Sequence, residues 1–433
     1  MSGSAKGNRA PFDLHYAWLV FAGCCCLMAG GLGAVLNSSG IFLVPIAEEL
    51  GFTRGELALY LSFYMIAMVF ASPIVGNLLP RANIRILMTC MFILVCLAEG
   101  LMSVYTQLWQ WYASGIVFGL CGTFCFILPT PLMIGNWFNK RRGLVLGIAM
   151  SFSGIGTAIW SPLFTFLIQN FGWRITYVLV ACIMAVLVLP WTMFVFRYRP
   201  SDMGLQPYGV KTDEAIPRTD KGTTDPKFLS GVPVKAAVFS TPFACIFLLC
   251  GLDEFYGGFG NQIPGFANSI GETAAFGATL LSIMSIGNIA IKICVGWLVD
   301  KIGVPRTVVI QLCACLIACL MFAFFREIWT LYFAAFLLGV QNSVVTVAEP
   351  LLVRHFFGEK NYAQLYSYCR VAGGIMGAFG IPAVAFIYDL SGGYELAFII
   401  GAFLAVFLAL LTILASFFKK HLKWVEAESI DGV

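Results

Sequence analysis

Twelve stretches of about 20 or more mostly apolar residues recur along this chain of 433 residues. Each is long enough to cross the hydrocarbon core of a bilayer, which is about 30 Å thick and needs about 20 helical residues. Hydrophobic residues make up 60% of the chain and charged residues 11%, which excludes an ordinary soluble globular protein. Because backbone groups in lipid must satisfy their own hydrogen bonds, we expect an all-α membrane protein with twelve transmembrane helices. The expected spans are residues 16–44, 55–79, 85–105, 108–135, 143–168, 173–196, 238–264, 273–298, 304–325, 328–353, 363–388 and 395–418.

The basic residues predict the orientation and the organisation of the chain. Most of the 26 Lys and Arg residues fall in segments on the same side as the N-terminus, and such residues are retained on the cytoplasmic side. Both termini are therefore predicted to be cytoplasmic, and the compact loops and absence of organellar addressing favour a prokaryotic cytoplasmic membrane. The expected organisation is an N-terminal tail (1–15), a six-helix bundle (16–196), a cytoplasmic linker (197–237), a second six-helix bundle (238–418) and a cytoplasmic tail (419–433).

Several kinds of site are not indicated by the sequence. The 15 cysteines lie mostly inside the spans and lack the spacing of a zinc site, so they are expected to be small packing residues. The three histidines fall at membrane edges or in the tail, and no GxxxxGK[ST] phosphate loop is present. We therefore expect no enzyme activity, no metal, no cofactor and no nucleic-acid partner, and a transport unit that is monomeric.

Two cations fall within apolar spans, which is the strongest functional signal in the chain. Lys292 and Arg370 each lie in a stretch that crosses the bilayer, where a charged side chain costs at least about 2.5 kcal/mol. Such residues usually face an internal, partly wet cavity, so the pair predicts a binding site for an anion. The alternative is that one or both only pair with a neighbouring helix or reach the membrane interface.

The two halves of the chain repeat each other weakly. A loop after the second span and a loop after the eighth both begin with a glycine and continue with basic residues. Acid and base in such a tight turn can hold a neighbouring helix end in one conformation and release it in another. The loop residues concerned are Gly76, Arg81 and Arg85 in the first half, and Gly296, Asp300, Lys301, Gly303 and Arg306 in the second.

These loops resemble the G-x-L-x-D-R-x-G-R signature of the major facilitator superfamily. The second copy keeps Asp300, Lys301 and Gly303, whereas the first has Pro80 in place of the acid and Asn83 in place of the glycine. Three further segments are similar to the monocarboxylate transporters and oxalate/formate antiporters of that superfamily. They are Asn136–Gly143 with the small-residue helix that follows, Gly172-Trp173-Arg174 together with Arg199–Gly209, and the eighth span around Lys292.

The resemblance implies roles for the two cations and raises a question about protons. Lys292 stands where the monocarboxylate group has an Arg that receives the substrate carboxylate, and Arg370 resembles the cation of span 11 in the oxalate/formate branch. Two charged relay positions of the monocarboxylate carriers are matched by Asn37 and Asn288, which cannot carry a proton. Asp253 and Glu254 are candidate replacements in the seventh span, unless that helix breaks near Gly257-Gly258 and leaves both acids in outside water.

Polar residues on the other expected cavity helices are candidate hydrogen-bond donors to a substrate, although ordinary helix packing is an equally good explanation for each. They are Asn37, Ser38, Tyr60, Tyr64, Ser151 and Tyr368, with Gln341 and Asn342 as further possibilities. Glu349 is interpreted as a partner for a cytoplasmic base and Pro350 as a kink.

The resemblance and the two cations together predict a secondary transporter of small organic anions, mono- or dicarboxylates, that works by alternating access. Either a proton would accompany the anion or a counter-anion would exchange with it. Partners would be the carboxylate substrate, the proton or counter-anion, and the lipid bilayer. Two alternatives are proton-coupled efflux of amphipathic or aromatic compounds, which the 39 Phe and 15 Met favour, and a sensor that has lost transport.

Overall fold

The structure is a computed structural model that describes residues 15–209 and 231–422, and both parts are almost entirely helical. The predicted tails therefore lie largely outside the described residues and the predicted linker about half outside them, and their boundaries stay predictions. The first part contains α1 (Ala17–Leu27), η1 (Met28–Asn37), α2 (Gly40–Leu50), α3 (Arg54–Leu78), α4 (Ile84–Leu101), η2 (Met102–Val104), α5 (Leu108–Gly122), η3 (Thr123–Ile127), α6 (Pro129–Trp137), α7 (Arg142–Pro190), η4 (Trp191–Val195) and η5 (Pro200–Met203). The second part contains α8 (Val234–Val238), α9 (Thr241–Asn261), α10 (Ile263–Ser269), α11 (Ala274–Ile302), α12 (Val304–Phe324), α13 (Ile328–Leu338), α14 (Gln341–Ser343), η8 (Val344–Ala348), α15 (Glu349–Phe357), α16 (Tyr362–Ser391), α17 (Glu395–Phe418) and η9 (Lys419–His421).

The helices account for the twelve membrane crossings expected. Ten helical stretches of the described residues are long and apolar enough to cross a membrane. One of these, Arg142–Val195, contains a break at Gly172, where φ is 76° and ψ is 162°, so it forms two crossings. Only glycine adopts such a φ without strain. The 30-residue helix α16 is not among those ten, but its length allows one further crossing, so the structure is consistent with twelve, and the all-α membrane fold is confirmed.

Local sequence signals explain where several helices begin and end. Thr53 accepts a hydrogen bond from the backbone N–H of Glu56, whose carboxylate accepts one from the backbone of Thr53, which is a capping box at the start of α3. Ser240 and Thr273 cap α9 and α11 in the same way through their hydroxyl oxygens. The crossings built from α1, α5 and α13 each continue through a π-helical turn, a local distortion that often occurs at functional sites.

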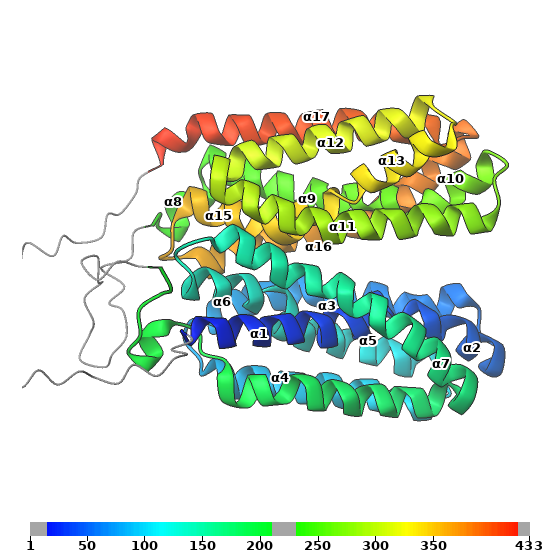
Figure 1. Cartoon of the computed structure of the whole chain (residues 1–433), viewed down its shortest axis with the longest axis horizontal. Helices are drawn as coiled ribbons and strands as arrows, with labels where there is room; N and C mark the ends of the chain where they lie inside the picture. Colours follow the sequence, from blue (N-terminus) through cyan, green and yellow to red (C-terminus); the bar gives the residue numbers. More distant parts are fainter. Residues whose placement is uncertain (1–14, 210–230, 423–433) are drawn as a thin grey trace, which may run out of the picture.

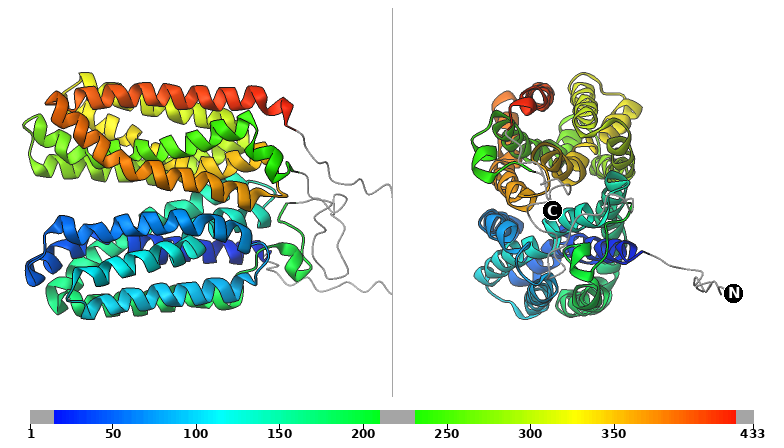
Figure 2. Two further views of the ribbon diagram at one scale, coloured as in Figure 1. Left: turned by 180° about the vertical axis from the view of Figure 1, so that it is seen from behind. Right: turned by 90° about the vertical axis from the view of Figure 1, so that its left-hand side faces the viewer.

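The crossings form two bundles that lie side by side, the first half of the chain in one and the second half in the other (Figures 1 and 2). Two helix pairs join the bundles: α7 with α11, and α3 with α16. Glycines make the first contact possible, since a Cβ on Gly296 would collide with the backbone of Gly143, and one on Gly147 with the backbone of Lys292. The bundles meet at the end where α1 begins and diverge at the other end (Figure 1).

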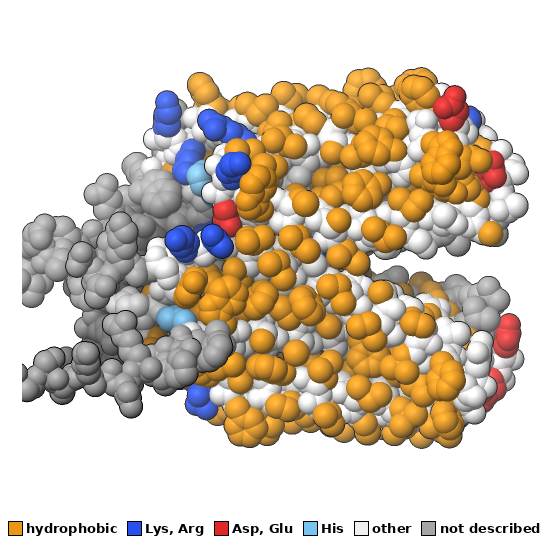
Figure 3. Space-filling view, viewed as in Figure 1, with side chains coloured by type: hydrophobic (Ala, Val, Ile, Leu, Met, Phe, Trp, Pro, Cys, Tyr) orange, Lys and Arg blue, Asp and Glu red, His pale blue; other side chains and the backbone are white. Residues whose placement is uncertain are grey.

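The outer surface suits a lipid environment. Large apolar side chains such as Phe70, Val186 and Phe403 are exposed on the crossings. Figure 3 shows these apolar side chains over most of the length, with Lys and Arg gathered at the end where the bundles meet and acids mostly at the other end. The same view shows the molecule hollowed between the bundles at the end away from the basic residues. The distribution is that of a multi-pass membrane protein whose two halves are closed together at the basic end.

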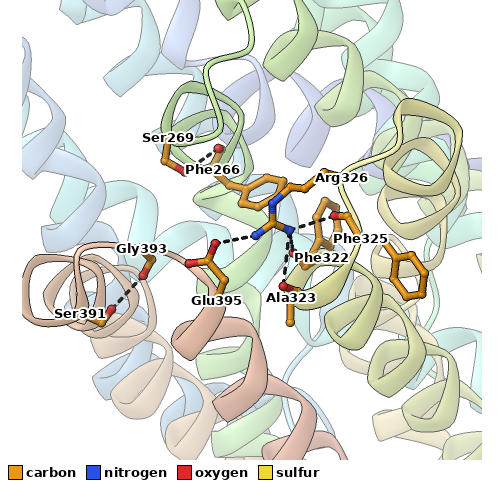
Figure 4. Close-up of polar contacts among 9 residues, drawn as sticks. All are labelled: Phe266, Ser269, Phe322, Ala323, Phe325, Arg326, Ser391, Gly393 and Glu395. Carbon is orange, nitrogen blue, oxygen red and sulfur yellow. Dashed lines mark hydrogen bonds and ion pairs between the residues drawn. The ribbon is translucent and has the colours of Figure 1, made fainter.

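At the diverging end, one arginine in each bundle links the ends of neighbouring helices. Arg326, between α12 and α13, donates to Glu395 at 2.5 Å and to the carbonyl oxygens of Phe322 and Phe325 at 2.9 Å (Figure 4). It ties the start of α17 to the α12–α13 turn. In the first bundle, Arg174 of α7 pairs with Glu49 of α2 at 3.2 Å and donates to the carbonyl of Ser103.

Candidate functional site

Arg370 of α16 lies at the centre of a buried charged cluster in the second bundle. Its guanidinium Nη2 donates to Glu254 Oε1 of α9 at 2.5 Å, and its Nη1 lies 3.4 Å from Glu349 Oε2, at the start of α15. The side chains of Arg370 and Glu349 are 6% and 0% exposed, whereas that of Glu254 is 27% exposed. Glu254 is therefore the most exposed member of the cluster.

Asp253 lies beside this cluster without a cation of its own. Its residue is 1% exposed, and neither carboxylate oxygen has a hydrogen-bond partner among the described residues. Oε1 of Glu349 is likewise buried without a partner. The backbone carbonyl of Asp253 accepts a hydrogen bond from Gln341 at 2.8 Å, which ties α9 to the crossing that carries Glu349. Two carboxyl groups thus contact the guanidinium of Arg370, and a third, that of Asp253, lies near enough to feel its charge.

The structure contradicts two of the interpretations offered for these acids. The alternative in which the seventh crossing breaks near Gly257-Gly258 is wrong, because α9 runs unbroken to Asn261 and keeps Asp253 inside the bundle. The interpretation of Glu349 as a partner for a cytoplasmic base is also wrong. Glu349 directly follows the π-helical turn η8 and pairs instead with Arg370 within the membrane crossing.

Lys292 of α11 lies apart from the acids, at the contact between the two bundles. It is 2% exposed, and its ammonium group lies 3.4 Å from the carbonyl oxygen of Met150 and 3.5 Å from Ser153 Oγ, both on α7. Among the described residues no carboxylate forms an ion pair with it. Within the described residues, the ammonium group of Lys292 therefore contacts only neutral oxygens of the opposite bundle. An anion would bind this ammonium group more strongly than those oxygens do, because the hydrogen bond would be charge-assisted on both sides.

The other predicted site residues divide between the cluster and ordinary packing. Tyr64 of α3 is buried and near enough to Arg370 and Glu254 to interact with both charges, and Tyr60 is buried one turn away. Asn288, one turn from Lys292, has a buried side-chain oxygen without a partner in the described chain. The hydroxyl of Ser151 donates to carbonyl oxygens of Gly147 and Ile289, which is a packing role.

Four further candidates are not brought to the cations by any contact. Asn37 is exposed at the end of η1, while its neighbour Ser38 donates to the carbonyl of Gly33. Tyr368 accepts a hydrogen bond from Gln364, one turn earlier on the same helix. Asn342 is exposed, in contrast to Gln341.

The loop of the second half does hold a helix end of the first half. The carboxylate of Asp300 accepts hydrogen bonds from the backbone N–H groups of Gly143 and Leu144, each at 2.9 Å, at the start of α7. A negative group at a helix N-terminus is favourable, because unpaired N–H groups point toward it. Gly296 lets α11 approach, Gly303 adopts a φ of 88° at the turn, and the ammonium of Lys301 lies 4.6 Å from the Trp297 ring centroid.

The matching loop of the first half makes a different contact. A Cβ on Gly76 would collide with Ser367 and with the carbonyl of Ala363 in α16, so this glycine permits the α3–α16 contact. Arg81 and Arg306 are exposed and Arg85 is half-buried, and none of the three forms an ion pair within the described residues. With Pro80 in the place of the acid, the first loop has no carboxylate to reproduce the contact of Asp300.

A second closure at the same end was not predicted from the sequence. Glu359, in the turn between α15 and α16, pairs with Arg142 of the first bundle at 3.2 Å and with Arg354 of its own bundle at 2.5 Å. Burial acts to raise the pKa of Glu359, but the two guanidinium groups hold the pKa below its usual range, so the carboxylate is ionised at neutral pH. The sequence signal was an acid in a basic turn, whose partner 217 residues earlier no local pattern specifies.

Glu99 of α4 is a buried acid that sequence reasoning also missed. It is 4% exposed in the first bundle, near Tyr60 and Tyr177, and no ion pair involves it within the described ranges. An acid within an apolar span is a signal that could have been found in the same way as Lys292 and Arg370.

Comparison with known proteins gives the family. The family model of the Major Facilitator Superfamily matches residues 19–326 and, in a second match, residues 243–431. The chain belongs to the major facilitator superfamily. It is thus a relative of membrane transporters rather than of enzymes. Its fold also matches the fucose transporter FucP in the outward conformation, with a TM-score of 0.63 at 14% identity over 92% of this chain and 99% of that one.

Curated relatives include transporters named for monocarboxylates. Monocarboxylate transporter 13 of Rattus norvegicus is 24% identical over 94% of this chain and 91% of its own length. Monocarboxylate transporter 12-B of Danio rerio is 27% identical over 68% of this chain, and the match spans 64% of that protein. The MFS-type transporter pynF of Aspergillus niger is 26% identical over 71% of this chain. These relatives are eukaryotic, so they give no support to the prediction of a prokaryotic membrane.

Proposed function

We propose that this superfamily member is a proton-coupled transporter of small carboxylates, mono- or dicarboxylates, that works by alternating access. The observation that carries the proposal is the pairing of one unneutralised cation, Lys292, with a separate buried cluster of three carboxyl groups around Arg370. The first suits an anionic substrate and the second suits a proton. The names of the monocarboxylate relatives support a carboxylate as the substrate class.

The charge of the cluster supports a proton as the coupled ion. With all three acids ionised, Asp253, Glu254 and Glu349 would place three negative charges around the single positive charge of Arg370. An unpaired charge in a buried site is costly, so at least one of these acids holds a proton. Glu254 is the partly exposed one, so it is the acid that exchanges protons with water in the open space.

Protonation of Glu254 would free Arg370 for the substrate. A neutral carboxyl group binds a guanidinium less strongly than a carboxylate does, because the charge-assisted hydrogen bond is lost. The substrate carboxylate then takes the place of Glu254 on Arg370. Proton and monocarboxylate together add no net charge to the site, which lowers the cost of moving it across the membrane. Binding of the anion without the proton would add a charge that the site cannot neutralise.

Lys292 would link substrate binding to the movement of the two bundles. In the present conformation its ammonium group binds oxygens of α7, so it helps to hold the bundles together at the basic end. A substrate carboxylate competes for the same ammonium group and offers a charged acceptor in place of neutral ones. Loss of the Lys292 contacts to α7 weakens this closure. Opening of the basic end then completes one half of the transport cycle.

The basic end is proposed to face the cytoplasm, with both chain termini on that side. The supporting observation is that Lys and Arg side chains gather where α1 begins and α17 ends (Figures 1 and 3). In this orientation the described conformation opens to the outside.

The test is uptake of labelled lactate, pyruvate, formate and oxalate into proteoliposomes, with and without a pH gradient or internal anion. We expect wild-type uptake to need the gradient, and Lys292→Gln and Arg370→Gln to transport none of the four acids. Lys235→Gln is the matched control, because Lys235 is an exposed cation outside the two sites. Uptake driven by internal anion alone would replace symport with exchange. If no carboxylate moves, or both variants transport normally, efflux of amphipathic compounds or a sensor without transport takes the place of this proposal.

A further inference from the structure

A small cavity lies between the two bundles at the basic end, away from the proposed transport site. Its volume is about 130 Å³, well below the roughly 300–1,000 Å³ of pockets that hold drug-sized ligands. Arg81, Asn136 and Arg199 contribute to its wall from the first bundle, and Glu359, Lys360 and Gln364 from the second. The cavity is therefore formed only when the bundles are closed together at this end.

The charge of the cavity wall is strongly positive. Arg81, Arg199 and Lys360 line it, and none of the three takes part in an ion pair within the described chain. The acid in the wall, Glu359, is already paired with Arg142 and Arg354. The carboxylate of Asp202 lies nearby and accepts a hydrogen bond from the backbone N–H of Arg199. The wall itself therefore carries three cations and one acid, and this excess of positive charge attracts an anion.

A further buried cation lies behind the cavity wall. The side chain of Arg354 is 7% exposed, its Nε and Nη1 atoms have no hydrogen-bond partner in the described ranges, and its Nη1 lies against Gly135 of α6. It contacts two wall residues, since it pairs with Glu359 and its guanidinium lies 5.5 Å from the ring centroid of Tyr362. Tyr362 and Ala363 open the 30-residue helix α16, whose N-terminus faces the cavity without a side-chain cap. Helix N-termini attract anions through their free N–H groups.

We propose that this cavity binds a phosphate-type oxyanion that bridges the two bundles. Arg81 and Arg199 hold it from the first bundle, and Lys360 holds it from the second. Opening of the basic end separates these residues, so the anion binds the present conformation in preference to the opposite one. Such a ligand acts as a brake on the transport cycle from the basic side. Its phosphate group comes either from a free phosphate or from the headgroup of an anionic lipid, because both offer the same oxygens.

Binding to the full-length protein in phosphatidylcholine nanodiscs tests the proposal without any transport substrate. One arm adds labelled inorganic phosphate and measures bound phosphate and thermal stability. The other arm uses nanodiscs that also contain a phosphoinositide, with native mass spectrometry to count retained lipid. We expect wild-type protein to bind and to be stabilised in at least one arm. Arg81→Gln/Lys360→Gln is expected to bind at least about 10-fold more weakly, since two charge-assisted contacts are lost.

The matched control is Lys140→Gln/Lys235→Gln, which also removes one exposed cation from each bundle at this end but leaves the cavity wall intact. It is expected to bind as the wild type does. Binding of phosphate identifies a soluble source, and binding of the phosphoinositide alone identifies a lipid headgroup. The proposal is overturned if neither probe binds, or if both double variants lose the same affinity, because general surface charge would then explain the effect. A failure here leaves the transport proposal untouched, since no carboxylate is involved.

Discussion

The two bundles are alike at their surface and different inside. At the diverging end, Arg174 in the first bundle and Arg326 in the second each tie a helix end to a glutamate and to backbone carbonyls. In the interior, the second bundle holds Asp253, Lys292 and Arg370 with two glutamates, whereas Glu99 is the buried charged residue within the described crossings of the first. The two halves therefore share a helical scaffold but differ in their buried charged residues.

This difference shows how a bundle can contain buried charged side chains and remain folded. The buried charge of Arg370 is tolerated in the second bundle because α9 and α15 bring Glu254 and Glu349 within ion-pair distance of it. The first bundle contributes neutral groups to the contact, namely carbonyl and hydroxyl oxygens and glycines of α7. The buried charges therefore lie mainly in the second bundle, and the first bundle meets Lys292 with neutral groups.

The largest expected effect comes from removing the centre of the charged cluster. Arg370→Gln removes the cation that pairs with the buried Glu349 and the partly exposed Glu254, and loss of one partner of a buried ion pair costs about 3–5 kcal/mol. We expect no measurable uptake, because the proposed partner of the substrate carboxylate is gone, and a lower thermal stability, because the paired acids lose their cation. The double variant Arg370→Gln/Glu254→Gln should recover stability but not transport. Recovery of neither would mean that the cluster is only structural.

Glu254→Gln is the next largest expected effect and sharpens the comparison by separating the proton from the anion. Glutamine keeps the shape of the side chain but cannot take up a proton, and it loses a charge-assisted bond worth about 1.5–3 kcal/mol. We expect uptake driven by a pH gradient to fall about tenfold or more, while exchange of internal for external carboxylate persists. Glu48→Gln, an exposed acid outside the cluster, is the control. Gradient-driven uptake that survives in Glu254→Gln would move the proton site elsewhere.

The sequence predicted the fold better than it predicted the site. Apolar length and basic loops are local patterns, so the twelve crossings could be read directly. Lys292 and Arg370 were found for the same reason, since each is one charged residue within one apolar stretch. Partners could not be found, because Glu254, Glu349 and Arg370 come from three helices whose relative rotation depends on packing across the whole bundle.

The contacts between the two bundles were also only partly predictable from the sequence. The loop motif suggested that Asp300 holds a helix end, but only the structure identifies α7 as that helix. The ion pair between Glu359 and Arg142 could not be predicted in this way, since neither residue lies in a motif that specifies a partner. Glu99 was simply overlooked, although an acid in an apolar span is a visible signal.

Asp300→Asn tests the contact that a carboxylate of the second bundle makes with the start of α7 in the first. Asparagine can accept one of the two N–H groups at the start of α7 but loses the negative charge, which is worth about 0.3–1 kcal/mol and up to ~2 when partly buried. We expect backbone amide exchange in the segment around Gly143 and Leu144 to become roughly 5–30-fold faster. Hydrogen–deuterium exchange with mass spectrometry measures this. Asp202→Asn, which alters a contact within one bundle, should leave that segment unchanged.

The surface likeness of the bundles predicts equal and smaller effects at the diverging end. Arg174→Gln and Arg326→Gln each remove a partly exposed ion pair, and such pairs contribute about 0–1 kcal/mol. Thermal unfolding should show a similar small loss in both variants, with uptake retained. A large loss in only one of them would mean that the scaffold is as asymmetric as the interior.

Glu99→Gln carries the smallest expected effect and the sharpest test of the asymmetry. Glu99 lies among tyrosines without a cation, and glutamine is a neutral side chain of nearly the same volume, so little interaction energy is lost. We expect uptake within about 2-fold of wild type and thermal stability within about 0.5 kcal/mol, as for substitutions that break no network. The measurement is gradient-driven uptake side by side with Glu254→Gln. If Glu99→Gln abolishes that uptake while Glu254→Gln does not, the proton travels through the first bundle, and the division of labour between the bundles is the reverse of the one proposed.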